Sequence, residues 1–213
     1  MDKGTLNKTI LIAPHPDDEV YGCASYLKNC DDSLLVVYVT SYHSLFPDGR
    51  NKHEQRQLSE WLGFQSEYMN TRAETNKLDK LGQLYFIKQF EALINKHRPE
   101  LVLLPSPSYN QDHRVVYDAA LTAMRAHDRI HFVKKILLYE EPDTWGTMRK
   151  PEPFNASYFR PLDMAFKHQL LSIYSSQMRG HRTPEQVEAI ARVRGMQADM
   201  EYAEAFEVVR WIE

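Results

Sequence analysis

The alternation of apolar runs with amphipathic segments along the chain predicts a domain that contains both strands and helices. Four apolar runs have the short length and uniform hydrophobicity of strands buried on both faces of a sheet. Such strands are typical of parallel sheets, whose two faces are both covered by helices. The predicted strands are Thr9–Ala13, Leu34–Thr40, Leu101–Leu104 and Ile136–Tyr139.

Segments of helical length lie between and after these runs. The first of them joins the first two strands into a strand–helix–strand unit, Gly63 ends the second, and Pro99 follows the third. The predicted helices are Asp18–Asn29, Lys52–Leu62, Leu81–His97, Val115–Ala126, Phe166–Gln177 and Pro184–Glu204. Strands that alternate with helices imply a mostly parallel sheet with right-handed crossovers, so the fold class is α/β.

The chain is expected to form a single domain over residues 1–213, because it has no internal repeat, low-complexity tract or Gly/Ser linker. The segment Pro142–Pro161 carries four prolines and is predicted to be a long surface loop. It could cover the functional site or an interface between subunits. The sequence leaves open both its role and the formation of a homo-oligomer.

Composition and charge limit the partners that we expect for the protein and indicate its cellular compartment. The formal charge of −3 and the isoelectric point near 6.3 provide no large positive field, so nucleic acid is not expected as a partner. The apolar run Ile10–Ala13 is too short for a signal core or a membrane span, so no membrane insertion is expected. Cys23 and Cys30 are predicted to be reduced thiols on one helix. Together these features predict a cytoplasmic protein.

The segment with the most distinctive chemistry follows the first predicted strand and reads APHPDDE, residues 13–19. Ligands of open parallel sheets bind at the carboxyl ends of the strands, which is where this turn lies. A purely structural interpretation also exists, because Pro16 and the acidic residues suit the first turn of a helix.

A second segment, PSYNQDH at residues 107–113, follows the third predicted strand and precedes the next helix. His113 is therefore expected at the same edge of the sheet as His15. A single histidine in a loop usually has no special function. Two such loops at one edge of a sheet favour a shared site.

We predict that His15, Asp18 and His113 bind one metal ion. Two imidazoles and one carboxylate leave a coordination position open, as in catalytic zinc sites, whereas structural sites have four ligands and often use cysteine. The same three ligands would also suit iron(II), so they predict a metal site more specifically than they predict zinc.

The neighbouring polar residues suggest a hydrolytic reaction. Zinc in an open site lowers the pKa of bound water from about 16 to roughly 7, and a nearby carboxylate can accept the proton as the water attacks a carbonyl. Asp17 lies beside a ligand and is predicted to be this general base. Asn110 is predicted to donate a hydrogen bond to the developing oxyanion. Asp112 is predicted to orient Asn110 or His113.

The motifs HPDDE at residues 15–19 and NQDH at residues 110–113 resemble those of the LmbE-like, or PIG-L-like, N-acetylglucosaminyl deacetylase family. The resemblance continues over nearly the whole chain through further short elements. These are Glu54, Leu62–Gly63, Leu138–Glu140, Lys167, Tyr174-x-Ser176-Gln177, Arg194–Gly195 and Tyr202–Phe206. It implies a Rossmann-like three-layer α/β sandwich and a small-molecule substrate, an acetamido sugar or sugar conjugate.

The resemblance assigns the same roles as the chemistry. In that family the first histidine and second aspartate of the leading motif hold zinc together with the last histidine of the second motif. The corresponding residues here are His15, Asp18 and His113, and the general base corresponds to Asp17. The implied activity is zinc-dependent removal of the acetyl group from an N-acetylglucosamine-type sugar.

Two departures from the family pattern affect the substrate site. Asn110 replaces the first histidine of the commoner second motif, so stabilisation of the transition state would depend more on the metal. Asn51 stands where the family often has a substrate-binding arginine, and the preceding Arg50 is the predicted replacement. The NQDH form resembles members linked to bacterial surface polysaccharides, which favours a nucleotide-linked or polymer-linked acetamido sugar.

Other functions and residues stay open at this point. The same site could hydrolyse the amide of another small conjugate, such as a thiol-sugar or an antibiotic precursor. A metal-binding or sugar-binding module without catalysis is a third interpretation, for which Asn110 is the hint. Further candidates for the site are Tyr42, His43, Tyr109, Trp145, Arg182, Glu140 and Glu141.

Overall fold

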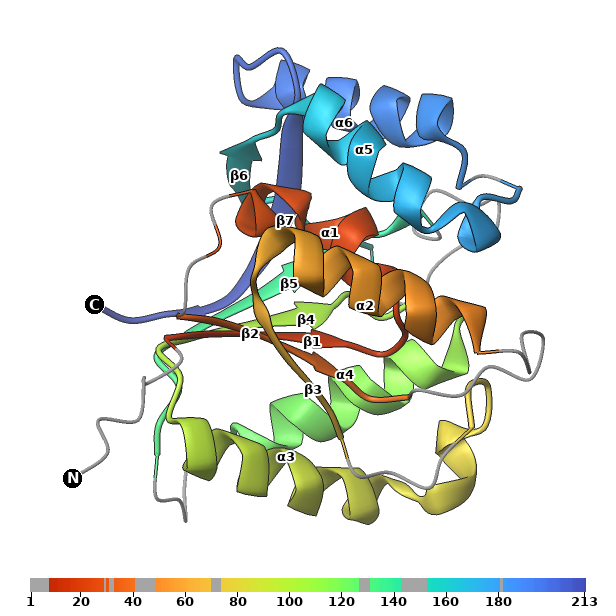
Figure 1. Ribbon diagram of the computed structural model, residues 1–213. Helices are drawn as coiled ribbons and strands as arrows, with labels where there is room; N and C mark the ends of the chain where they lie inside the picture. The colour runs from red at the N-terminus through yellow and green to blue at the C-terminus, as the bar shows by residue number, and fades with distance from the viewer. Residues whose placement is uncertain are drawn as a thin grey trace.

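A seven-stranded sheet forms the centre of the protein in the computed structural model (Figure 1). The structure describes residues 8–28, 30, 33–40, 49–69, 74–126, 131–142, 153–180 and 182–213. The strands are β1 (Thr9–Ala13), β2 (Leu34–Tyr38), β3 (Gln65–Tyr68), β4 (Leu101–Pro105), β5 (Lys135–Tyr139), β6 (Tyr158–Pro161) and β7 (Ala203–Trp211). Their order across the sheet is β3-β2-β1-β4-β5-β7-β6, and the first five are parallel.

Helices cover both faces of this sheet (Figure 1). One face carries α3 (Gln83–His97) and α4 (Gln111–Ala123), and the other carries α1 (Asp18–Leu27), α2 (Arg50–Leu62), α5 (Met164–Ile173) and α6 (Pro184–Gln197). Short 3-10 helices, η1 (Leu78–Leu81) and η3 (Ser175–Gln177), precede α3 and follow α5. The predicted three-layer α/β fold with a mostly parallel sheet is confirmed.

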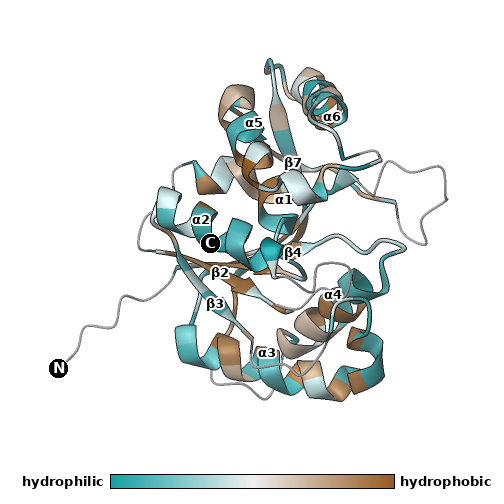
Figure 2. Ribbon diagram, turned by 45° about the vertical axis from the view of Figure 1, so that its right-hand side comes forward, coloured by the Kyte–Doolittle hydropathy of each residue, from teal (hydrophilic) through white to brown (hydrophobic). Residues whose placement is uncertain are grey.

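The uniform hydrophobicity of the central strands follows from these layers. In β1, Ile10 and Ile12 pack toward α3 and α4, whereas Leu11 and Ala13 pack toward α1 and α5. Both sets are fully buried, so neither face of the strand tolerates polar residues. Figure 2 shows the contrast between these apolar strands and the largely hydrophilic α2.

The C-terminal part of the chain differs from the prediction. The last helix was predicted to run to Glu204, but α6 ends at Gln197, and Ala203–Trp211 form β7. The helix stops because the chain turns back over its end: Asp199 has a left-handed φ of 54°, and the Gly195 carbonyl accepts bonds from Ala198 and Met200. The prediction that this helix continues beyond Gln197 is therefore wrong.

Two edge strands have no counterpart in the predicted elements. β3 has the polar sequence QSEY and, within the described part of the chain, pairs with β2 only, so its hydrophobicity does not distinguish it from a loop. β6 lies inside the segment predicted as a loop and pairs antiparallel with β7. Residues 143–152 of that predicted loop lie outside the described residues.

The start of α4, the two cysteines and the length of the helices can each be compared with the prediction from sequence. α4 begins at Gln111, four residues before the predicted start, so His113 lies in the first helical turn rather than in a loop. Cys23 lies in α1 and Cys30 follows that helix, and both are free thiols. Among the described helices, none is long and apolar enough to cross a membrane.

The strand order determines where a site can form. From β1 the chain continues through α1 to β2 on one side, and from β4 it continues through α4 to β5 on the other. The segments that leave the carboxyl ends of β1 and β4 therefore diverge, and ligands of doubly wound sheets bind at such a divergence. These two segments contain His15 and His113.

Buried polar contacts hold α1 against the last strand. The helix departs from helical geometry at Cys23, whose φ is −138°. Glu204 of β7 accepts hydrogen bonds from the amides of Ala24 and Ser25 at 2.9 and 2.7 Å, and Lys167 donates to Glu204 at 2.7 Å. The lysine and the glutamate are both buried, so each charge is stabilised by its partner.

Gly22 in α1 is expected to be required for packing. A Cβ at this position would lie 2.2 Å from Cδ2 of Tyr139, a fully buried ring whose hydroxyl donates to the Ile12 carbonyl. Gly22→Ala should therefore lower the free energy of unfolding by about 1–3 kcal/mol, measured by urea denaturation. The loss should be smaller in a Tyr139→Leu background. Equal losses in both backgrounds would show that the ring is not the cause.

Candidate metal centre and adjoining cavity

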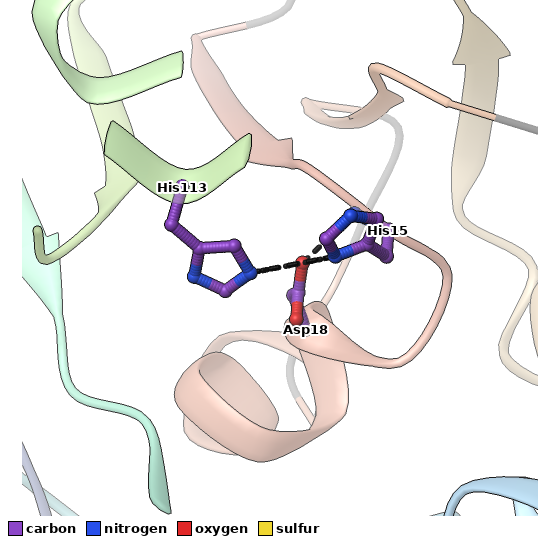
Figure 3. Close-up of side chains that lie close together, drawn as sticks. All are labelled: His15, Asp18 and His113. Atoms are coloured by element: carbon purple, nitrogen blue, oxygen red, sulfur yellow. Dashed lines mark hydrogen bonds and ion pairs between the residues drawn. The ribbon is translucent and has the colours of Figure 1, made fainter. Parts of the chain in front are cut away.

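His15, Asp18 and His113 converge at the carboxyl ends of β1 and β4 (Figure 3). Nδ1 of His15 and Nε2 of His113 each lie 3.5 Å from Oδ2 of Asp18, and the two nitrogens are 3.4 Å apart. His15 comes from the turn after β1, Asp18 from the first turn of α1, and His113 from the first turn of α4. The structure thus brings together the three residues that the sequence predicted as ligands.

The dimensions of this triangle fit a tetrahedral metal ion. Zinc bonds of about 2.0–2.2 Å in tetrahedral geometry place ligand atoms roughly 3.3–3.6 Å apart. In addition, Oδ1 of Asp18 is buried and has no hydrogen-bond partner among the described residues. A buried carboxylate oxygen in that state is costly, and a nearby cation would stabilise it. The residues therefore fit a bound divalent metal.

Carboxylates also contact the outer nitrogens of both histidines. Nε2 of His15 lies 2.9 Å from Oδ2 of Asp112, and Nδ1 of His113 lies 3.4 Å from Oε2 of Glu141. Carboxylates in this position orient metal-binding imidazoles and make them more basic. Burial alone would lower the pKa of His15, but hydrogen bonds to Asp112 and Asp18 raise it to about 10. The surplus of negative charge that favours a proton on His15 would also favour a metal cation.

The carboxylate of Asp112 makes a contact that the sequence did not predict. It was expected to orient Asn110 or His113, whereas its carboxylate contacts His15 and accepts hydrogen bonds from the amides of Asn76 and Leu78 at 2.5 and 3.2 Å. Its own amide donates to Oδ1 of Asn110, which caps α4. Asp112 thus links the second histidine-containing segment to His15 and to the start of η1.

Asp17 lies beside the centre in an unusual conformation. It is 2% exposed and has a φ of 127°, a region that costs L-residues about 1–3 kcal/mol. Its Oδ2 accepts a hydrogen bond from Nη1 of Arg182 at 3.0 Å. Burial and the adjacent Asp18 carboxylate raise the pKa of Asp17, while Arg182 opposes this shift. A raised pKa suits a group that must both accept and return a proton.

Glu19 stabilises the backbone of Asp17. Its Oε2 accepts from the Asp17 amide at 3.0 Å, and its Oε1 accepts from the hydroxyls of Tyr38 and Tyr174 at 2.9 and 2.6 Å. Burial raises the pKa of Glu19 to about 7, although these hydrogen bonds favour the ionised form. This network fixes the turn from which Asp17 projects.

A polar cavity adjoins the metal centre. The lining is almost entirely polar, and Pro16 is its one apolar member among the described residues. The lining residues are His15, Pro16, Asp17, Asn51, Thr75, Asn76, Asn110, Gln177, Arg179 and Arg182. Amides and guanidinium groups suit the hydroxyls and anions of sugar derivatives.

The predicted substrate residues fall into three groups. Asn110 and Arg182 line the cavity, whereas Arg50 is an exposed residue at the start of α2 and its neighbour Asn51 reaches the cavity instead. Tyr109 is 45% exposed and is not part of the lining. Tyr42, His43 and Trp145 lie outside the described residues.

Sequence reasoning did not identify Thr75, Asn76 and Arg179 as residues of the site. No catalytic motif includes them, and each reaches the cavity from a segment that joins regular elements. Gln177 carried a signal, because it belongs to the family-like Tyr-x-Ser-Gln element. In that element Tyr174 and Ser176 make supporting contacts, to Glu19 and Glu54 respectively.

Solved structures of other proteins share this fold. N,N′-diacetylchitobiose deacetylase from Pyrococcus horikoshii has a TM-score of 0.72 at 19% identity, covering 96% of this chain and 84% of that chain. The 4-carboxy-2-hydroxymuconate hydratase GalB from Pseudomonas putida KT2440 has a TM-score of 0.69 at 18% identity, with coverages of 97% and 98%. The zinc-inhibited form of teicoplanin deacetylase has a TM-score of 0.67 at 16% identity, with coverages of 95% and 98%. One of the three is a hydratase, so the fold alone does not identify the reaction.

Comparison with protein-family models identifies the family to which the chain belongs. A search of curated protein sequences finds no match. The family model described as PIG-L, GlcNAc-PI de-N-acetylase, matches residues 10–124. This region contains both segments of the metal centre and more than half of the 213 residues. The chain therefore belongs to the PIG-L family.

Proposed function

We propose that the protein is a zinc-dependent deacetylase that removes the acetyl group from an N-acetylglucosamine-type sugar or sugar conjugate. His15, Asp18 and His113 hold the metal, and Asp17 acts as the general base. The observation that carries this proposal is the triangle of three ligand atoms, with 3.4–3.5 Å edges, next to a buried carboxylate and a polar cavity. Family membership supports the same reaction.

Each residue has a defined part in this hydrolysis. Zinc at this centre supplies activation of a water molecule and polarisation of the acetamide carbonyl. Asp17 accepts the proton of the attacking water and returns it to the nitrogen of the departing amine, so that the C–N bond breaks and acetate leaves. Asp112 and Glu141 keep the two imidazoles oriented toward the centre.

Asn110 is placed to assist at the carbonyl. Its Oδ1 accepts the amide of Asp112 at 3.0 Å, which leaves the NH₂ end of the side chain as the donor. Asn110 also lines the cavity together with His15. We infer that this group stabilises negative charge that develops on the acetamide oxygen. Arg50 remains a predicted contact for the part of a substrate that extends beyond the cavity.

The proposal predicts one bound divalent ion and release of acetate. Purified protein should contain about one equivalent of zinc or iron by elemental analysis, and it should release acetate from a panel of N-acetylhexosamine glycosides and conjugates. Metal should be added in stoichiometric amounts, because a zinc-inhibited form of a structural relative exists. Metal-loaded protein that releases no acetate from any member of the panel would refute the substrate class.

Product analysis separates the remaining interpretations. Mass spectrometry of the products distinguishes loss of acetyl from cleavage of another amide in a thiol-sugar or antibiotic-like conjugate. A binding module without catalysis would retain metal and sugar and show no turnover with any amide.

A further inference from the structure

Helix α1 begins with the proposed ligand Asp18 and is broken at Cys23, whose φ is −138° instead of the helical value of about −63°. In a regular helix, the amides of Ala24 and Ser25 would donate to the carbonyls four residues before them. Here they donate to Oε1 and Oε2 of Glu204, at 2.9 and 2.7 Å. A side chain from β7 is therefore inserted at the break, and such an insertion changes the direction of a helix.

Lys167 of α5 satisfies the other side of the break. Its Nζ donates to the Tyr21 carbonyl at 2.6 Å and to Oε1 of Glu204 at 2.7 Å. In a regular helix, the Tyr21 carbonyl would instead accept from the amide of Ser25. Lys167 and Glu204 are 3% and 6% exposed. This buried ion pair thus supplies both the donor and the acceptors that the backbone needs at the break.

The sequence of α1 does not by itself require this break. The helix contains no proline, and a regular helix would satisfy the same backbone groups without any buried charge. Burial of a lysine and a glutamate carries a large desolvation penalty, which their mutual attraction offsets only when the geometry is good. The break therefore indicates that the first part of α1 has a direction that a regular helix would not give it.

That direction brings the first part of α1 to the metal centre. Gly22 packs directly on the ring of Tyr139 in β5, where a Cβ would lie 2.2 Å from Cδ2. Oδ2 of Asp18 accepts the His15 amide at 2.8 Å and lies 3.5 Å from both Nδ1 of His15 and Nε2 of His113. Distances between a metal and its ligands must be correct to within about 0.2 Å, so a small rotation of this segment would disturb the centre.

We propose that Lys167 and Glu204 are positioning residues for the metal centre: their ion pair stabilises the break in α1 and so orients Asp18 toward the two histidines. The inference rests on the proposed metal centre. Neither residue belongs to the candidate ligands or to the described lining of the cavity. Both lie in family-like elements, Lys167 and Tyr202–Phe206, that follow the residues 10–124 matched by the family model.

The test measures the zinc affinity of the metal-free protein by competition with a chromophoric chelator. Lys167→Met removes the donor to the Tyr21 carbonyl, and Glu204→Gln keeps the size of the side chain but removes its charge and one acceptor oxygen. Leu27→Ala is the control, because Leu27 is fully buried in α1 beyond the break and its truncation destabilises the fold through a cavity. Urea denaturation of each metal-free protein gives the loss of stability for comparison.

Lys167→Met and Glu204→Gln should each bind zinc about 10- to 100-fold more weakly than the wild type, the loss typical of residues that orient metal ligands. Leu27→Ala should keep the wild-type zinc affinity in spite of its lower stability. Where a single variant does not fold, Lys167→Met/Glu204→Gln replaces it, because the double variant leaves no unpaired buried charge. The double variant should bind zinc as weakly as the single variants.

Two results would overturn the inference. One is wild-type zinc affinity in the variants of Lys167 and Glu204, and the other is an equal loss of affinity in Leu27→Ala, which would trace the effect to stability alone. Wild-type protein that binds neither zinc nor iron would refute the proposed metal centre itself, and the inference with it.

Discussion

Replacement of Asp17 with asparagine is expected to lower the rate of acetate release by about 10²- to 10⁴-fold, the contribution of a positioned general base. Asparagine keeps the size of the side chain and, like aspartate, tolerates a positive φ better than alanine does, which matters at a φ of 127°. The amide cannot accept the proton of the attacking water. The loss should appear in kcat rather than KM, measured with metal-loaded protein.

Two measurements separate loss of the base from loss of the site. Elemental analysis should find the same metal content in Asp17→Asn as in the wild type, because the three ligand atoms belong to other residues. Thermal denaturation should show that the variant is folded. Turnover within a factor of about two of the wild type would show that another group is the base.

The convergence of the three candidate metal ligands could be predicted because their positions depend on topology. His15 and His113 follow strands that are neighbours in a parallel sheet, and Thr9–Leu11 pair in register with Leu101–Leu103. Segments that leave the same edge of adjacent strands must lie close together, whatever the details of the loops. The spacing of His15 and Asp18 within one turn supplied the third candidate ligand.

The contacts around the ligands could not be predicted in the same way. Arg182 reaches Asp17 across 165 positions of sequence, and the interaction depends on the path of the segment before α6. Glu141 was one of two neighbouring glutamates that could approach a ligand, and packing decided which one contacts His113. The other, Glu140, pairs with Arg194 instead. Side-chain choices of this kind are made by tertiary packing rather than by local pattern.

The missed strands have a similar explanation. β7 is buried in its first four residues and largely exposed afterwards, so it lacks the uniform hydrophobicity of the central strands. It also follows a helix with good helix formers up to Gln197, and nothing local except the Ala198–Met200 turn separates the two. β3 and β6 are short strands at the edges of the sheet, where one side of the strand has no partner among the residues that the structure describes. Periodicity predicts the centre of a sheet better than its edges.

His113→Ala is expected to remove the metal and reduce acetate release to background. The substitution deletes one of three ligand atoms and leaves the carboxylates of Asp18 and Glu141 buried without the imidazole between them. Binding of metal at a thousandfold excess over its Kd stabilises a folded protein by about 4 kcal/mol. A chelator should therefore lower the Tm of the wild type by roughly 8–16 °C, and it should have almost no effect on His113→Ala.

Asp112→Asn is the counterpart of His113→Ala, because it removes a residue that orients a proposed ligand instead of the ligand itself. Because Asp112 contacts the outer nitrogen of His15, its loss should weaken metal affinity by about 10- to 100-fold, and added metal should restore most of the activity. Added metal should not restore His113→Ala, and the exposed control His53→Ala should match the wild type in both metal content and Tm. If His113→Ala retained stoichiometric metal and activity, the ion would have to bind elsewhere, because two remaining ligands cannot hold it tightly.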